Sequence, residues 1–189
     1  MTSDDSKSDM DNNSVRQTDN DLNDFKNFTN LNTRLKRVRM MADYQFGKGV
    51  GKVLFDDHVT FLLSKTKRIR QIRSDGERLA TVRAKDGFFT LSMKGASRIH
   101  LFLKAPALRV VVCDDAVPFV SKGKTAFAKH IISIDSTLRA KEEVLITDRN
   151  DRLIATGQLA LSPDEIMTGN YGVGVFVRNG IEKEDNPEE

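Results

Sequence analysis

The chain has 189 residues, which allows one domain or two small ones, and its 30 Lys and Arg against 27 Asp and Glu give a formal net charge of +3. One cysteine and no tryptophan exclude an intramolecular disulfide framework and a cysteine-based structural zinc site. No apolar run approaches the roughly 18 residues of a membrane-spanning helix, and the first residues lack the pattern of a signal peptide, so we expect a soluble, cytoplasmic protein.

The charges are distributed unevenly along the chain. Residues 31–75 hold eleven basic and four acidic side chains, and residues 76–104 hold six and two, so this stretch of 74 residues carries a net charge of +11. Residues 105–180 are balanced at nine and nine. The basic stretch favours binding to the phosphates of nucleic acid, with a merely solvated surface as the alternative.

Both ends of the chain are acidic. Residues 1–30 and 181–189 each carry a net charge of −4 and few apolar side chains. Such segments bury too little apolar surface to offset the entropy lost on ordering, so we predict disordered acidic tails at 1–30 and 182–189. The tails either mask the basic body against non-specific nucleic acid or serve solubility only.

Residues 31–104 are predicted to form a basic α+β domain with helices packed on a short antiparallel sheet. Asn30 can cap a first helix that ends at the glycines of 47–51, with Leu31, Leu35, Val38 and Ala42 at helical spacing. Runs separated by Asp-Gly turns predict strands at 59–63, 68–73, 79–84 and 88–91, the stretch 65–73 being the least regular because Ile69 and Ile72 would point to opposite faces. Ser92 can cap a second helix.

After a linker at 105–107, residues 108–181 are β-rich. Apolar runs predict five strands, at 109–113, 126–134, 143–147, 153–161 and 173–177, with a tight connection at 148–151. Ser162-Pro-Asp-Glu165 has the residues of a capping box and should start a short helix. We therefore predict a small mixed β pseudobarrel.

No motif supports catalysis or metal binding. Gly47-Lys-Gly-Val-Gly-Lys52 and Gly123-Lys-Thr125 imitate phosphate loops, but the first is one residue short and follows a helix, and the second has Pro118 in place of its first glycine. The three histidines are scattered, and Cys113 at a strand end is most simply a small buried hydrophobe. We expect no enzyme activity, cofactor or metal.

Several segments, in order, resemble known RNA-binding domains. RVVVCDDAVPFV at 109–120 and GKTAFAKH at 123–130 resemble the start of a PUA domain, an RNA-binding pseudobarrel of RNA-modifying enzymes, and segments up to GVGVFVR at 172–178 fit its remainder. Upstream, ADYQFGKG at 42–49, SKTKRIR at 64–70 and the segment 79–87 resemble the domain that precedes PUA in the archaeosine-forming tRNA-guanine transglycosylase of archaea. The resemblance covers about residues 34–180.

The resemblance implies where RNA would bind, because the family's PUA module grips the acceptor stem and 3′ end of tRNA. Carried over, its contacts are Val117, Pro118, Phe119, Gly123, Lys124, Thr125, Phe127, Lys129, Gly172 and Arg178. Core packing is the alternative for Phe127 and Val175, and His130 stands where an aromatic residue is expected. Since the PUA part is charge-neutral, we predict a second contact surface upstream, at Arg34, Arg37, Lys65, Lys67, Arg68 and Arg70.

The family enzyme has a catalytic β/α barrel and a Cys/His zinc site ahead of these domains, and this sequence has neither. The resemblance thus implies a non-catalytic tRNA-binding subunit whose partners are tRNA and a separate transglycosylase. The alternative is a free-standing PUA protein that acts on another RNA or in ribosome or RNA maturation. A complete small enzyme is a third hypothesis.

Overall fold

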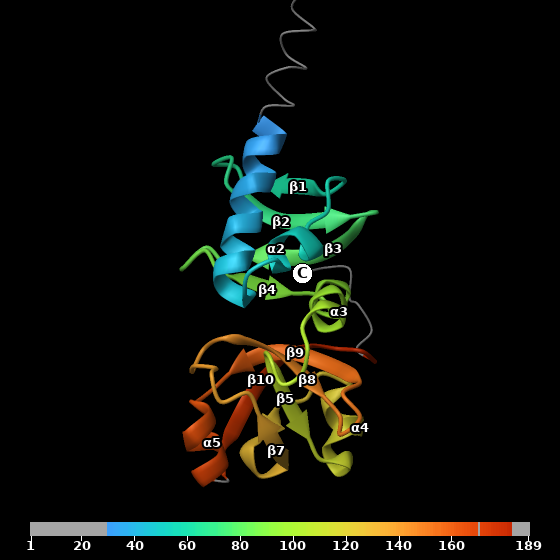
Figure 1. Cartoon of the computed structure of the whole chain (residues 1–189), viewed down its shortest axis with the longest axis vertical. Helices are drawn as coiled ribbons and strands as arrows, with labels where there is room; N and C mark the ends of the chain where they lie inside the picture. Colours follow the sequence, from blue (N-terminus) through green and yellow to red (C-terminus); the bar gives the residue numbers. More distant parts are fainter. Residues whose placement is uncertain (1–29, 170, 183–189) are drawn as a thin grey trace, which may run out of the picture. The chain divides into compact units, whose positions relative to one another are not determined.

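A computed structural model describes residues 30–169 and 171–182 (Figure 1). The chain divides into two units, residues 1–38 and 39–189. The predicted acidic tails lie, apart from residues 30 and 182, outside the described residues.

The first predicted helix is confirmed and spans residues 30–46, crossing from the first unit into the second. Leu35 and Val38 in its first half and Ala42 and Phe46 in its second half are buried. The helix ends at Gly47, which has a φ of 111° and whose amide donates to the carbonyl of Asp43. A left-handed glycine is a common helix stop, because it carries no Cβ to clash.

A short helix that the sequence analysis missed follows at once, α2 (Val50–Leu54). Its glycine-rich start was interpreted only as the end of the first helix. A Cβ on Gly51 would lie 2.2 Å from the carbonyl oxygen of Arg39, so this glycine lets two helices approach closely. The Asp43 carboxylate accepts a hydrogen bond of 2.6 Å from the Gly51 amide and ties the two segments together.

Four antiparallel strands and a helix complete this part, as predicted: β1 (Thr60–Leu63), β2 (Ile69–Ser74), β3 (Glu77–Val82), β4 (Phe89–Leu91) and α3 (Met93–Phe102), with sheet order β1-β2-β3-β4. Asp75 and Gly76, at φ 53° and 78°, make the tight turn between β2 and β3. A bulge at Arg70, which was not predicted, separates Ile69 from Ile72: Leu62 pairs with Gln71 whereas Leu63 pairs with Ile69.

The second sheet is mixed and has six strands rather than the five predicted. It contains β5 (Arg109–Val112), β6 (Ala126–Phe127), β7 (Ile131–Ile134), β8 (Glu143–Thr147), β9 (Leu153–Leu159) and β10 (Val173–Gly180), in the order β6-β10-β9-β8-β5-β7. Among the described strands, β5 and β8 are the one parallel pair. The single strand predicted at 126–134 was wrong, because the turn η2 (Ala128–His130) divides it.

That turn gives the sheet its near-barrel form. The edge strands β6 and β7 are consecutive in the chain and only three residues apart, so the two edges of the sheet come together. The strands enclose an apolar core that includes Val110, Ile146 and Val175. The helices η1 (Asp114–Ala116), α4 (Val117–Val120) and α5 (Pro163–Gly169) fill the connections, and the capping box between Ser162 and Glu165 forms as predicted.

Side chains of the second sheet hold the backbone of β4. Glu143 of β8 accepts a hydrogen bond of 3.1 Å from the Leu91 amide, and Asn179 of β10 donates one of 2.7 Å to the Leu91 carbonyl. Arg178 pairs with the other Glu143 oxygen at 3.1 Å. Burial raises the pKa of Glu143 to about 7, although Arg178 and the Leu91 amide both act to lower it.

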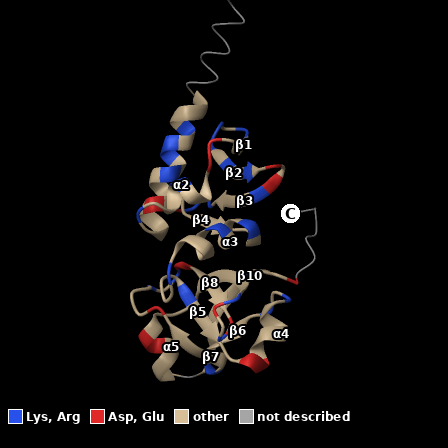
Figure 2. Ribbon diagram, turned by 45° about the vertical axis from the view of Figure 1, so that its right-hand side comes forward, with Lys and Arg blue, Asp and Glu red and all other residues tan. Residues whose placement is uncertain are grey.

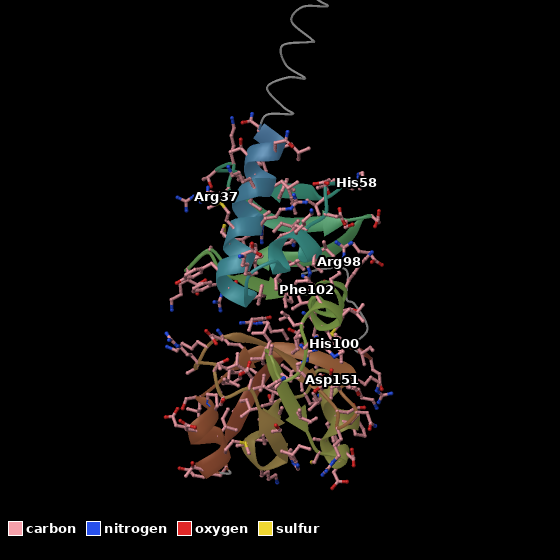
Figure 3. All side chains as sticks on the ribbon, viewed as in Figure 1. Arg37, His58, Arg98, His100, Phe102 and Asp151 are labelled. Carbon is pink, nitrogen blue, oxygen red and sulfur yellow. The ribbon has the colours of Figure 1, made fainter. Side chains whose placement is uncertain are left out.

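Arg109, whose side chain is only 3% exposed, makes a second set of buried polar contacts. It donates to the carbonyls of Ala107, His100 and Leu103 and pairs with Asp151 at 3.2 Å. His100 Nε2 also lies 3.3 Å from Asp151 (Figure 3). Burial acts to raise the pKa of Asp151, but Arg109 and His100 outweigh it and hold that pKa below its usual value.

Candidate nucleic-acid interface

The loop between β1 and β2 and the start of β2 present four exposed cations, Lys65, Lys67 and Arg68 in the loop and Arg70 in the strand. The loop backbone is fixed by hydrogen bonds between Ser64 and Arg68 and between Lys67 and Ser64, of 2.8 and 2.9 Å. Among the residues that the structure describes, none of the four cations has a carboxylate within ion-pair distance. The loop therefore offers charge that is free to meet phosphates. In Figure 2, blue marks the Lys and Arg residues of this loop and of β2.

Other basic residues of the same stretch are already engaged within the protein. Arg39 pairs with Asp57 and also donates to the Phe55 carbonyl. Arg98 pairs with Asp56 at 2.8 Å and also bonds Leu54 and Ser74. Burial acts to raise the pKa of Asp56, but hydrogen bonds from the His58 amide and Arg98 lower it. Counting charges along the sequence could not separate these structural cations from the free ones.

Arg34 and Arg37, the remaining predicted upstream contacts, lie in the first half of the helix 30–46, within the first unit. Arg37 is exposed (Figure 3) and Arg34 is half-buried. Both stay predictions as contact residues.

The second group of predicted residues lies on α4, on the loop that follows it, on β6 and η2, and just before β10. Pro118, Phe119, Lys124, Phe127, Lys129 and Gly172 are exposed, whereas Val117, Gly123 and Thr125 are half-buried. Gly123 has a φ of 84°, and its amide and that of Lys124 bond back to Val120 and Phe119, which makes a compact turn after α4.

Strand pairing brings Gly172 to this group from a distant part of the chain. Phe127 lies opposite Val173, and the Ala128 amide donates to the Gly172 carbonyl at 3.0 Å. Core packing is confirmed for Val175, which is fully buried, and wrong for Phe127, which is 45% exposed. Ala126, the neighbour of Phe127, points into the core instead, as alternation along a strand requires.

Arg178 differs from the other predicted RNA-contact residues, because its side chain is bonded within the protein. Its guanidinium bonds Glu143 and Gln158, so it organises the buried carboxylate that holds β4. A role in binding phosphate or a base stays untested. The sequence analysis did not predict this pairing, because Glu143 and Arg178 are 35 positions apart and lie in strands whose register only the folded sheet defines.

The sequence analysis also did not single out several exposed aromatic side chains. Tyr171, next to Gly172, and Phe176, two residues before Arg178 in β10, are 81% and 53% exposed. The outward direction of Phe176 follows from its position beside the buried Val175. Tyr44, in the helix 30–46, and Phe88, just before β4, form another exposed pair.

Neither a metal-binding group of side chains nor a membrane-spanning helix is found in the described part of the chain. It contains no group of three or more His, Cys, Asp or Glu side chains that could hold a metal ion. None of its helices has the length and apolar character needed to cross a membrane.

Two family models match the chain. Residues 36–106 match the patch-forming domain C2 of tRNA-guanine transglycosylase, and residues 108–181 match the PUA domain. The chain carries a C2 domain and a PUA domain. The first contains the basic loop and the four-stranded sheet, and the second contains the six-stranded sheet.

Relatives support the same pairing of a C2 and a PUA domain. A tRNA-guanine(15) transglycosylase of Thermococcus kodakarensis is 46% identical over 148 residues, which are 78% of this chain and 25% of that protein. The C2–PUA chain thus spans about a quarter of the relative's length and resembles its C-terminal domains.

Two solved structures share the fold at low sequence identity. A hypothetical protein of Pyrococcus horikoshii superposes with a TM-score of 0.63 at 16% identity, over 79% of this chain and 91% of that one. A PUA domain of Aeropyrum pernix superposes with a TM-score of 0.57 at 10% identity, over 78% and 82%. They confirm the predicted order of a small α+β part and a mixed near-barrel.

Proposed function

We propose that this chain binds tRNA through its C2 and PUA domains and serves as a non-catalytic subunit for archaeosine-forming tRNA-guanine transglycosylation. The observation that carries the proposal is the 46% identity to a tRNA-guanine(15) transglycosylase over 148 residues, a longer stretch than either domain alone. The chain matches only a quarter of that enzyme, so the chemical step belongs, in this proposal, to a separate polypeptide.

The proposed division of labour follows from charge. The free cations at 65–70 neutralise phosphates and release counterions, which gives affinity without sequence selectivity. The PUA domain is charge-balanced and contributes shape: the turn at Gly123, the exposed Lys124 and Lys129 and the adjoining Gly172 would grip the acceptor stem and 3′ end. RNA backbone can approach a glycine more closely than any other residue.

Recovery of bound RNA and protein from the native source tests this proposal. The full chain is captured from a lysate, and the RNA and proteins that accompany it are identified. We expect tRNA together with a transglycosylase, and we expect the chain to raise that enzyme's base-exchange rate when the two are mixed. Turnover by the purified chain alone, or recovery of neither RNA nor enzyme, contradicts the proposal.

The second candidate is a free-standing PUA protein that acts on another RNA or in ribosome or RNA maturation. One observation favours it: the similar Pyrococcus horikoshii chain is covered over 91% of its length, so this two-part fold also makes up nearly all of another chain. Capture of a different RNA without a transglycosylase would select this candidate.

A further inference from the structure

The C2 domain carries an exposed pair of aromatic rings outside both predicted contact surfaces. Tyr44, near the end of the helix 30–46, and Phe88, just before β4, have parallel rings within 4° whose centroids are 6.4 Å apart. Tyr44 is 83% exposed and Phe88 is 38% exposed. Aromatic rings left this open contribute little to the core, so the pair needs another explanation.

The backbone beneath the pair is held rigidly. Gln45, the residue after Tyr44, accepts a hydrogen bond of 2.7 Å from the Phe89 amide and donates one of 3.0 Å to the Phe89 carbonyl. This double contact joins the helix to the edge of the sheet one residue beyond each ring. The two rings are therefore positioned before any ligand arrives, which lowers the entropic cost of binding.

The loop at 83–88 fixes the other side of the pair. Arg83 and Asp86 form a two-pronged ion pair at 3.0 Å, and the Phe88 amide donates to the same carboxylate. The Arg83 guanidinium lies 5.6 Å from the centre of the Phe88 ring, within the range of a cation–π contact. Phe88 thus has both a cation and the Tyr44 ring as neighbours.

The charge around the pair suits a polyanion. Lys48, four residues after Tyr44, and Lys85, three residues before Phe88, are exposed, and neither has a carboxylate within ion-pair distance among the described residues. The nearest acidic groups in sequence are engaged, Asp86 by Arg83 and Asp43 by the Gly51 amide. An open aromatic face with a basic rim is the arrangement that proteins use to stack unpaired bases of RNA.

We propose that Tyr44 is a stacking platform for an unpaired nucleobase of the bound RNA, with Phe88 and Arg83 as its support. The proposal rests on the RNA binding proposed above and adds a contact that reads single-stranded RNA. The base would stack on the face of the Tyr44 ring that does not face Phe88, since the Tyr44 side chain is 83% exposed.

The fluorescence of Tyr44 gives a direct test. The chain has no tryptophan and two tyrosines, so in the full chain with Tyr171→Phe all tyrosine emission comes from Tyr44. A 12-nucleotide oligoadenylate should quench this emission saturably, and the same strand paired with its complement should not. A protein is the other possible occupant; it would leave the emission unchanged by RNA, which overturns the proposal.

Affinity measurements provide the second test. Tyr44→Ala should weaken binding of the oligoadenylate about tenfold, whereas Tyr44→Phe keeps the ring and should bind like the wild type. The salt dependence should keep its slope, because no cation is removed. Leu101→Ala removes an apolar side chain of equal exposure, 83%, and serves as the control.

The outcomes separate the two proposals. If the wild type binds the oligoadenylate and Tyr44→Ala binds it equally well, the platform is wrong and the RNA-binding function stands. If the wild type binds neither this strand nor tRNA at low salt, the proposed function itself fails. Thermal melting of each variant establishes that it is folded.

Discussion

Arginine plays opposite roles in the two sheets. In the C2 domain, Arg68 and Arg70 are exposed and, within the described residues, have no carboxylate partner. In the PUA domain, Arg109 and Arg178 bond carboxylates and carbonyls of the protein itself. The comparison teaches that burial, and not residue type, decides the role: a buried charge must be paired, whereas an exposed one remains available to a ligand.

The largest effect should come from breaking the pair at Glu143. Arg178→Met leaves a carboxylate that is 2% exposed without its cation, so we expect a loss of about 3 kcal/mol of unfolding free energy at pH 8. Denaturant titration measures it. Arg149→Met, which breaks the exposed pair with Asp114, is the control and should cost less than about 1 kcal/mol. Equal losses would show that burial does not distinguish the two pairs.

The pH dependence of stability is a second measure of what the burial of Glu143 costs. The folded-state pKa of Glu143, raised to about 7, lies above its ordinary value, so the folded protein holds this proton more tightly than the unfolded chain. The contribution of Glu143 to the free energy of unfolding is largest below about pH 4.5. It falls by roughly 2–3 kcal/mol as the pH rises to about 7.

Urea titrations from pH 5 to pH 8 should show this decline in the wild type and not in Glu143→Gln, whose amide does not titrate. Asp56, Asp135 and Asp151 do not interfere, because their pKa values are lowered and their contributions change only in more acidic solution. Parallel profiles of the two proteins would contradict the assignment to Glu143.

Removal of free cations from the C2 domain should affect RNA binding rather than stability. The double substitution of Lys67 and Arg70 by Ala should weaken tRNA binding about tenfold at moderate salt and lower the slope of log K against log salt by one to two. The slope is measured by titration at several salt concentrations.

The matched control removes Arg139 and Lys141, two exposed cations of the PUA domain, and should change the slope less. If the C2 substitutions leave the slope unchanged, Lys67 and Arg70 face solvent only and do not contact phosphates. Equal changes in slope in the two variants would contradict the proposal that the C2 domain makes more of the phosphate contacts than the PUA domain.

The smallest expected effect concerns the end of the RNA. If the PUA domain grips the 3′ end, trimming the 3′-terminal nucleotides of tRNA should lower affinity a few-fold, because most of the electrostatic contact is retained. Gel-shift titration of intact and trimmed tRNA measures this. Equal affinities would rule out recognition of the end.

Local patterns in the sequence predicted most of the fold. The Asp-Gly turn at 75–76, the Ser92 cap and the capping box at Ser162 each form as expected, since each depends on residues within four positions. The prediction failed for α2 and for the division at 128–130. In both places a short apolar run allowed more than one structure, and packing chose between them.

The candidate interface was only partly predictable. The sequence by itself determined that residues 31–104 carry the positive charge and that a glycine stands at position 123, because composition and residue type need no partner. Only the tertiary structure decided which cations are free, that Glu143 is buried against Leu91, and that Tyr44 meets Phe88. Each of these depends on two residues distant in the chain, and their meeting is set by strand register and helix packing rather than by either residue alone.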